Sequence, residues 1–246
     1  MPSSDRFARH VALSAMGAAG QAALSNATAA VIGVGGLGCP AALYLANSGV
    51  GRLILNDFDR IDETNLPRQI LFQDGDVGSP KVVTAAARLK QSAPTTAIET
   101  LGARLDANEL LAIAERADVV LDCTDNFQTR IAINQACVKA NCPLIVGAAI
   151  RLEGQLAVLP TPASGPCYRC IYTDSDELLG DCQGNGVLAP VPGVIGSLMA
   201  LEAIKLLALK PRPKSSLLIW DAHSGDWQRL AISADSQCQA CGQPAT

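Results

Sequence analysis

The chain has few aromatic residues and few charged ones. Phe, Trp and Tyr together make up 4% of its 246 residues, and Asp, Glu, Lys and Arg make up 17%. The scarcity of aromatic rings argues against an extended surface for stacking bases. The formal net charge of −4 and the sequence pI near 5.2 give no basic excess, which a general nucleic-acid binder would normally carry on one face. We therefore expect no nucleic-acid partner.

The sequence also lacks the pattern of a secretory leader and that of a membrane span. Polar and charged residues interrupt the apolar stretch that a leader would need, namely Asp5, Arg6, Arg9 and His10. The longest apolar tract, 186–209, contains Glu202 and Lys205. The nine cysteines are an odd number in a chain too long for a small disulfide scaffold. These absences predict a cytoplasmic protein with reduced thiols and no membrane partner.

The first 150 residues alternate between short apolar runs and helical patterns. Strands are predicted at 28–32, 52–55, 96–101, 119–123 and 144–148, and helices at 39–48, 81–91, 108–116 and 126–140. Pro80 is expected as the first residue of the helix at 81–91. Continuous apolar strands that alternate with helices are typical of a parallel sheet covered on both faces. The pattern predicts an α/β fold with a Rossmann-like, doubly wound and mostly parallel sheet.

The pattern changes after residue 150. Strands are predicted at 155–159, 217–220 and 227–232, a turn-rich loop at 160–166, a mobile polar loop at 172–189 and a buried helix at 194–209. We expect the last strands to be antiparallel. No linker divides the chain, so 1–246 is predicted to be a single domain, with a nucleotide-binding half at 1–150 and a second half at 151–246.

The strand at 28–32 leads directly into a glycine-rich loop. Gly33, Gly35 and Gly38, with Gly36 between them, match the dinucleotide-type fingerprint. Such glycines permit a tight turn, close approach of the backbone to a phosphate and close packing of helix on strand, and the helix that follows directs its N–H groups at the anion. Asp57 stands at the end of the next strand, where its carboxylate can accept from ribose hydroxyls. Asp59 is a weaker ribose candidate, or a cap of the next segment. The loop does not distinguish ATP from NAD.

Two Cys-x-x-Cys pairs stand in the second half of the chain. They are Cys167 with Cys170 and Cys238 with Cys241, and 67 residues separate the pairs. Four thiolates in two such pairs predict a closed, tetrahedral structural Zn²⁺ site that joins distant segments. A second group of cysteines falls on predicted core elements and is expected to be buried: Cys39, Cys123, Cys137 and Cys142.

Taken together, these motifs resemble the ThiF/MoeB/HesA family, which adenylylates ubiquitin-like sulfur carriers and is related to ubiquitin-activating enzyme. The resemblance runs through RFARH at 6–10, GVGGLG at 33–38, NLPRQ at 65–69, GSPK at 78–81, DCTDN at 122–126, CYRC at 167–170, AIK at 203–205 and CQAC at 238–241. It covers almost the whole chain. It implies ATP-dependent adenylylation of the C-terminal Gly-Gly carboxylate of a small sulfur-carrier protein, with release of pyrophosphate, for thiamin or molybdopterin-type biosynthesis.

The resemblance also implies roles for individual residues. Arg68 and Lys81 are expected to reach the triphosphate, with Asn65 near the phosphates. This agrees with the chemistry, since attack of a carboxylate on the α-phosphate requires positive charge around the equatorial and leaving oxygens. Asp125 is expected to work with Mg²⁺, although the residues alone also allow it to cap the following helix.

The remaining implications concern partners. Arg9 is expected to act across a homodimer as an arginine finger, and Cys182 matches a cysteine that can bond covalently to the carrier, although nothing beside it would lower its pKa. We expect the carrier's tail to pass under the 172–189 loop, so that 151–246 is both the zinc-bearing and the carrier-binding half. Because the sequence stops soon after Cys241, we expect no rhodanese-like domain and a separate sulfur donor.

Three other hypotheses stay open on the residues alone. An NAD-dependent oxidoreductase would explain the glycine loop and Asp57, but it leaves Arg68, Lys81 and the cysteine pairs unexplained, and no histidine stands in an obvious catalytic setting. A zinc-stabilised nucleotide-binding scaffold without activity would not need the charged residues. A tRNA-modifying relative of the same group fits the acidic charge and the paired cysteines less well.

Overall fold

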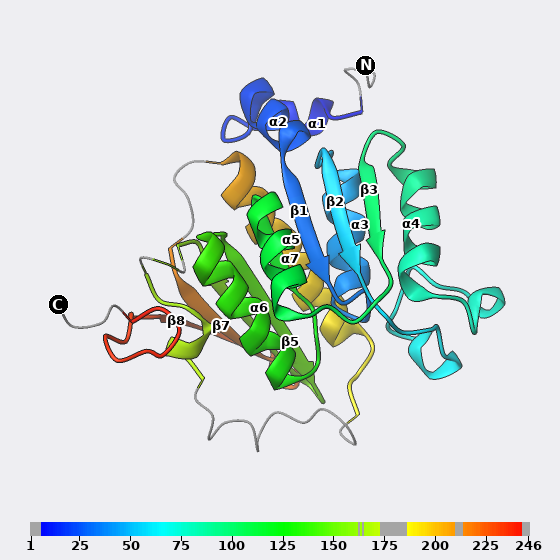
Figure 1. Ribbon diagram of the computed structural model, residues 1–246. Coiled ribbons are helices and arrows are strands. Elements are labelled where there is room, and N and C mark those ends of the chain that lie inside the picture. The colour runs from blue at the N-terminus through cyan, green and yellow to red at the C-terminus, as the bar shows by residue number, and fades with distance from the viewer. Residues whose placement is uncertain (1–5, 162, 164, 173–185, 210–213, 243–246) are drawn as a thin grey trace.

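The protein is built on one mixed sheet with helices on both faces (Figure 1). The computed structural model describes residues 6–161, 163, 165–172, 186–209 and 214–242. The strands are β1 Thr28–Ile32, β2 Arg52–Asn56, β3 Ala97–Leu101, β4 Val119–Asp122, β5 Leu144–Ile150, β6 Glu153–Leu159, β7 Ser216–Asp221 and β8 Asp226–Ala231. The helices are α1 Ala8–Val11, α2 Gly17–Asn26, α3 Gly38–Asn47, α4 Lys81–Ser92, α5 Ala107–Arg116, α6 Phe127–Ala140 and α7 Pro190–Ala208, with short 3-10 turns η1 Glu63–Asn65, η2 Asp74–Asp76 and η3 Tyr168–Cys170.

The eight strands follow the order β3-β2-β1-β4-β5-β6-β7-β8. Strands β1 to β5 pair in parallel, whereas β5 with β6, β6 with β7, and β7 with β8 pair antiparallel. The predicted α/β fold, with a doubly wound parallel part and C-terminal antiparallel strands, is thereby confirmed. The chain runs outward from β1 to β3 and then returns to place β4 on the other side of β1, so the strand order reverses beside β1. Ligands of open α/β sheets bind at such a point, outside the carboxyl ends of the strands.

Two hydrophobic cores lie on opposite faces of the sheet. Helices α3 and α7 pack behind the sheet as seen in Figure 1, and α5 and α6 pack in front of it. The parallel strands alternate between the two cores, since Ala29 and Val31 belong to one and Ala30 and Ile32 to the other. Burial on both faces is the reason that these strands read as continuous apolar runs rather than alternating ones.

By length and composition alone, helix α7 could cross a membrane, since an 18-residue window of it has a mean hydropathy of 1.6. However, half of that window is buried inside the protein. It packs on α2, α3, β5 and β6. Its one acid, Glu202, is 5% exposed and accepts hydrogen bonds from Lys205 Nζ at 2.7 Å. The helix therefore belongs to the core of the sheet, as the sequence predicts.

Several element boundaries differ from those expected. Helix α7 begins at Pro190 rather than 194, because prolines in a first turn remove only N–H groups that have no helical partner. Pro80 is the N-cap of α4, with φ −62° and ψ 128°, and not its first helical residue. Helices α1 and α2 were not predicted from the sequence. Every residue of β8 is exposed, so this strand shows only weak alternation between apolar and polar side chains.

Candidate functional site

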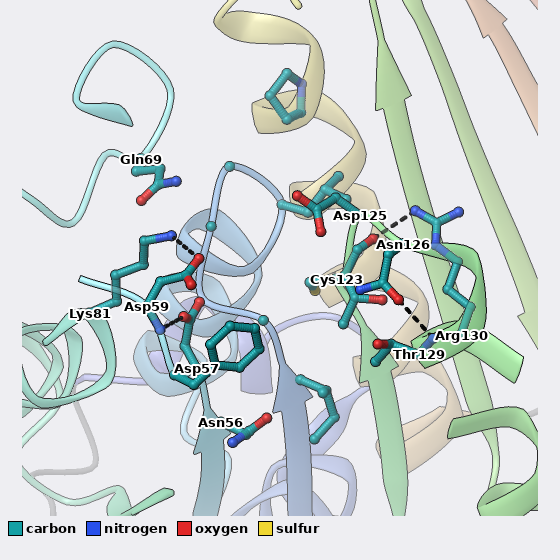
Figure 2. Close-up of a pocket in the computed structure, with 18 of the residues that line it drawn as sticks. Asn56, Asp57, Asp59, Gln69, Lys81, Cys123, Asp125, Asn126, Thr129 and Arg130 are labelled. Atoms are coloured by element: carbon teal, nitrogen blue, oxygen red, sulfur yellow. Dashed lines mark hydrogen bonds and ion pairs between the residues drawn. The ribbon is translucent and has the colours of Figure 1, made fainter. Parts of the chain in front are cut away.

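A cleft of about 720 Å³ opens at the carboxyl ends of the parallel strands. Its lining comes from the ends of β1, β2 and β4, the segment around η1, and the start of α7 (Figure 2). Nearly all residues predicted for the nucleotide line it: Gly33, Gly35, Gly36, Asp57, Asn65, Arg68, Lys81 and Asp125. The topology thus brings together side chains that lie far apart in the sequence.

The glycines of the loop meet two different requirements. Gly33 has φ +90°, and a Cβ there would lie 2.9 Å from the carbonyl oxygen of Cys123. A Cβ on Gly38 would lie 1.9 Å from the carbonyl oxygen of Gly33. Gly35 is different, because its nearest neighbour to such a Cβ is Gln69 Nε2 at an ordinary 3.6 Å. Gly33 and Gly38 are therefore needed to fold the turn onto α3, whereas Gly35 leaves open space on the cleft side.

Asp57 holds the glycine loop in place. One carboxylate oxygen accepts from the Val34 N–H at 2.7 Å, and the other accepts from the Asp59 N–H at 2.9 Å. Burial raises the pKa of Asp57 above its usual value, against the opposing charge of Lys81 and these two backbone donors. The side chain lines the cleft, and its contact with a ribose stays a prediction.

Lys81 is held in position by an ion pair with a neighbouring acid. Its Nζ lies 2.9 Å from Asp59 Oδ2, and its side chain is 7% exposed while that of Asp59 is 53% exposed. The possible capping role of Asp59 was wrong, because Asp62 is the N-cap of η1. Asp59 instead directs the lysine ammonium into the cleft (Figure 2). Burial of the lysine limits its motion and keeps one positive charge at a fixed place.

The segment after η1 supplies a second cation and an amide. Arg68 donates from Nη1 to the Thr64 carbonyl at 2.8 Å, and its Cγ lies 3.4 Å from the Cβ position of Gly36. Gln69, which the sequence analysis did not single out, is 3% exposed beside Gly35. Its Oε1 has no hydrogen-bond partner among the residues that the structure describes. The NLPRQ motif thus places Asn65, Arg68 and Gln69 on one wall of the cleft.

The structure separates Asp125 from the cap of α6. Asn126 is the N-cap, and its Oδ1 accepts from the Thr129 N–H at 2.8 Å. Asp125 is exposed and lines the cleft, in the turn that follows the buried end of β4 (Figure 2). The alternative in which Asp125 serves as the helix cap was therefore wrong, and its carboxylate is available to a cation in the cleft.

Of the two remaining predicted catalytic residues, one is not brought to this cleft and the other lies outside the described residues. Arg9 lies on α1, beyond the amino end of β1 and therefore at the opposite end of the sheet (Figure 1). Its predicted action across a dimer stays a prediction. Cys182 and most of the predicted 172–189 loop lie outside the described residues.

Other residues in the cleft were missed by sequence reasoning. The guanidinium of Arg104 lies 4.3 Å from the centroid of the Phe58 ring, and both line the cleft beside Asp57. Arg130 enters from α6 on the other side. For Phe58 the sequence did offer a signal, because this residue lies between Asp57 and Asp59. Arg104 and Arg130 had none, because only the fold brings them to this place.

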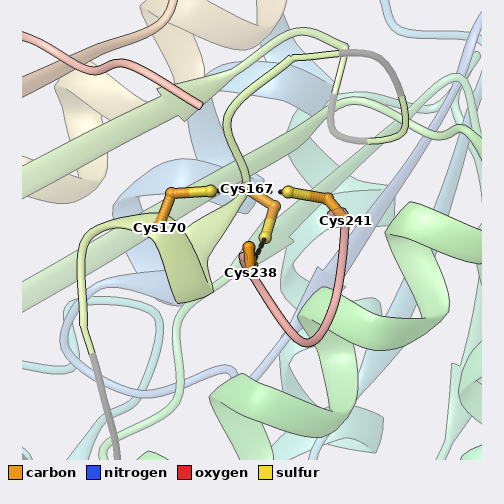
Figure 3. A group of neighbouring side chains, drawn as sticks. All are labelled: Cys167, Cys170, Cys238 and Cys241. Carbon is orange, nitrogen blue, oxygen red and sulfur yellow. Dashed lines mark hydrogen bonds between the residues drawn. The ribbon is translucent and has the colours of Figure 1, made fainter. Parts of the chain in front are cut away.

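The four predicted zinc ligands form one cluster (Figure 3). All four sulfurs lie within 4.8 Å of one another; Cys167 and Cys238 are 3.7 Å apart, and Cys170 and Cys241 are 3.4 Å apart. Tetrahedral Zn²⁺ with bonds of about 2.3 Å needs sulfurs about 3.8 Å apart, so the group fits that ion. The Asn134 amide and the Asp235 N–H each donate to a sulfur at 3.5 Å, which favours thiolates.

The remaining cysteines of the described chain are core residues. Cys39, Cys123, Cys137 and Cys142 are buried and form no disulfide. Burial raises the pKa of Cys39 to about 12. The prediction that these four residues are small packing groups is confirmed, because all four side chains are buried in the two cores.

Comparisons with known proteins agree with this geometry. The ThiF family model matches residues 7–240. An Escherichia coli (strain K12) protein named sulfur carrier protein ThiS adenylyltransferase is 45% identical over 237 residues, which cover 96% of this chain and 94% of that relative. A molybdopterin-synthase adenylyltransferase of the same organism is 43% identical over 239 residues, covering 97% and 96%.

The fold is also similar to that of solved structures. A crystal structure of E. coli MccB with ATP matches with a TM-score of 0.80 and 27% sequence identity, over 91% of this chain and 68% of that one. The family match spans the nucleotide-type glycine loop and three of the four clustered cysteines, and it ends one residue before Cys241. On the sequence, the fold and the cleft together, the chain belongs to the ThiF family.

Proposed function

We propose that this protein catalyses ATP-dependent adenylylation of the C-terminal Gly-Gly carboxylate of a small ubiquitin-like sulfur-carrier protein, with release of pyrophosphate. The observation that carries the proposal is the cleft, in which a phosphate-type glycine loop faces the basic side chains of Arg68 and Lys81 and the exposed carboxylate of Asp125. The near full-length similarity to two named adenylyltransferases supports it. The dehydrogenase alternative leaves Arg68, Lys81 and Asp125 without a purpose.

Each cleft residue that the sequence predicted for the nucleotide has a proposed contact with it. Gly33, Gly35 and Gly36 allow the loop backbone to approach the phosphates at the start of α3. Asp57 binds the ribose, and Asn65, Arg68 and Lys81 bind the phosphates. Asp125 holds Mg²⁺. Mg²⁺ takes few protein ligands and keeps several waters, so one exposed carboxylate is a suitable donor set. When bound, Mg²⁺ would neutralise charge on the phosphates.

The reaction needs positioning and positive charge rather than an enzyme nucleophile. An oxygen of the carrier's terminal carboxylate bonds to the α-phosphorus, and the bond from that phosphorus to the β-phosphate oxygen breaks with its electron pair. The products are an acyl-adenylate and pyrophosphate. Arg68 and Lys81 offset the charge that develops on the α-phosphate and the leaving group. The glycine loop and Asp57 fix the nucleotide so that the attacking oxygen approaches in line.

The proposed assembly is supported by where the residues lie. Arg9 is at the far end of its own sheet, so its charge reaches a cleft only from a second copy, as an arginine finger in a homodimer. Zn²⁺ in the cysteine cluster has a structural role, because four thiolates leave no open position. Reduced thiols suit a cytoplasmic protein. A separate protein supplies sulfur for thiamin or molybdopterin-type products, and a covalent link to the carrier through Cys182 belongs to that later stage.

Pyrophosphate exchange tests the proposed activity. Purified protein, ATP, Mg²⁺ and labelled pyrophosphate are incubated with a series of carrier proteins that end in Gly-Gly. We expect labelled ATP to form only with a carrier whose tail is intact, and Arg68→Ala to reduce exchange strongly while the fold is kept. A carrier without its last glycine is the control. Exchange that needs no carrier, or that persists in Arg68→Ala at the wild-type rate, would contradict the proposal.

The glycine loop allows a matched pair of substitutions. Gly35→Ala introduces a methyl group with only an ordinary contact, whereas the Cβ of Gly38→Ala meets backbone at 1.9 Å. We expect Gly38→Ala to lower the free energy of unfolding by about 3 kcal/mol or more. Gly35→Ala should leave unfolding nearly unchanged but weaken ATP binding, because the methyl group occupies the path of the phosphates. Denaturant unfolding and calorimetric titration with ATP measure the two effects.

A further inference from the structure

Helix α6 lies between the cleft and the cysteine cluster and contacts both. Near its start, Arg130 donates from Nη2 to the Thr124 carbonyl at 2.7 Å and to the Gly147 carbonyl at 3.2 Å. One turn later, Asn134 is fully buried and accepts from the Tyr168 N–H at 2.8 Å. These two residues are four apart and therefore lie on the same face of the helix.

Arg130 controls the peptide that leads into Asp125. The Thr124 carbonyl belongs to the peptide unit whose nitrogen is that of Asp125, so its hydrogen bond to Arg130 fixes the plane of that peptide. The Thr124 N–H and hydroxyl donate to Asp122 Oδ1 at 3.0 and 2.7 Å. The turn after β4 is therefore held from both sides, with the Asp125 carboxylate projecting into the cleft (Figure 2).

Arg130 also connects two strands where their pairing ends. The last pair between β4 and β5 joins Asp122 with Val146, and Gly147 is the next residue of β5. Its carbonyl accepts from Arg130. The positive charge of Arg130 also acts on Asp122, which is fully buried. One guanidinium thus acts on both β4 and β5 at the point where their pairing ends.

The same face of α6 also contacts the cysteine cluster. Arg130 Nη1 lies 3.5 Å from the Tyr168 hydroxyl, and Tyr168 is the residue after Cys167. Asn134 donates to Cys167 Sγ at 3.5 Å while it holds the Tyr168 backbone. Movement of the 167–170 turn would therefore be transmitted to the same helical face that positions Thr124.

We propose that α6 couples the cysteine cluster to the cleft, with Arg130 as the positioning residue for Asp125 and Asn134 as the positioning residue for Cys167. The inference rests on the proposed function in that Asp125 is taken to act with Mg²⁺. A group that orients a metal-binding side chain typically changes metal affinity by about 10–100-fold when it is lost. The expected consequence is therefore a weaker effect of Mg²⁺ on nucleotide binding.

The test measures binding of an ATP analogue with a methylene group between its α- and β-phosphates. The Mg²⁺ response is defined as the ratio of its Kd without Mg²⁺ to its Kd with Mg²⁺. We expect Arg130→Gln to lower this ratio about tenfold, and Arg130→Lys to give an intermediate value, because one ammonium cannot serve two carbonyls in the same geometry. Arg116→Gln removes an equal charge on α5, where its partner is Glu99, and should leave the ratio unchanged.

An unchanged ratio in Arg130→Gln, or a wild-type protein that ignores Mg²⁺, would overturn the role of Arg130. If Arg130→Gln does not fold, Arg130→Lys and Tyr168→Phe test the role of Arg130 instead. Each variant weakens a hydrogen bond made by Arg130 and should lower the Mg²⁺ response. A protein that shows the Mg²⁺ response but no pyrophosphate exchange with any carrier would refute the proposed function and leave the role of Arg130 supported.

Asn134→Leu tests the cluster end with a side chain of similar shape. We expect this variant to release zinc to a chelator about tenfold faster than wild type, as followed by absorbance of the chelator complex. The zinc-depleted protein should also show a reduced Mg²⁺ response. Zinc release at the wild-type rate, or an unchanged Mg²⁺ response after zinc has gone, would overturn the coupling through α6.

Discussion

Replacing Asp125 by alanine is expected to lower the rate of carrier-dependent pyrophosphate exchange by roughly 10²–10³-fold, with little change in stability. The side chain is exposed in the cleft and does not cap α6. Its removal therefore creates no cavity and leaves no helix end without its cap. What is lost is the carboxylate proposed to carry Mg²⁺, and with it the neutralisation of charge on the phosphates. Exchange at saturating ATP and carrier measures the effect.

The neighbouring Asn126 provides the matched control. Asn126→Ala removes the hydrogen bond to the Thr129 N–H and should lower the free energy of unfolding by about 1 kcal/mol. It should reduce exchange far less than Asp125→Ala does. Asp125→Ala with near wild-type exchange, or the two variants with the same profile of stability and activity, would mean that the proposed chemistry does not depend on this carboxylate.

Much of the fold could be predicted from the sequence because local signals and tertiary burial agree there. The strand at 28–32 is apolar on both faces and the structure buries both, so the prediction and β1 have the same ends. The glycine loop could be recognised because close backbone contacts exclude a Cβ at Gly38. The paired cysteines could be recognised from the Cys-x-x-Cys spacing within each pair. In each case, the requirement lies within a few consecutive residues.

The parts that could not be predicted depend on contacts between distant segments. The ion pair of Lys81 with Asp59 joins residues from α4 and from the loop after β2, and neither position shows by itself that it is paired. Gln69 is buried because the NLPRQ segment folds over Gly35. Arg130 appears in the sequence as a surface charge on α6, since nothing local indicates the carbonyls of Thr124 and Gly147. Such residues need the topology before their roles can be assigned.

Loss of zinc is expected to release the C-terminal part of the sheet while the nucleotide half stays folded. The cluster ties the 167–170 turn to the 235–242 segment, and β8, which precedes that segment, is exposed along its whole length. Few apolar contacts therefore hold β8 in place apart from the stacked rings of Trp220 and Trp227, whose centroids lie 4.9 Å apart. Zinc binding contributes roughly 10–16 kcal/mol in small zinc domains, much more than one ring stack provides.

Hydrogen exchange measures this effect segment by segment. In Cys238→Ser/Cys241→Ser, or in wild type after chelation, amides of β7, β8 and the 167–170 turn should exchange at least about 100-fold faster, which corresponds to about 3 kcal/mol of lost local stability. Amides of β1, β2 and β4 should keep their protection, because both cores bury these strands without help from the cluster. Cys142→Ala is the control, since this buried thiol lies outside the cluster and its removal should not select the C-terminal strands. Uniform loss of protection across the sheet would show that the ion stabilises the whole domain, whereas no change at β7 and β8 would show that these strands need no metal anchor.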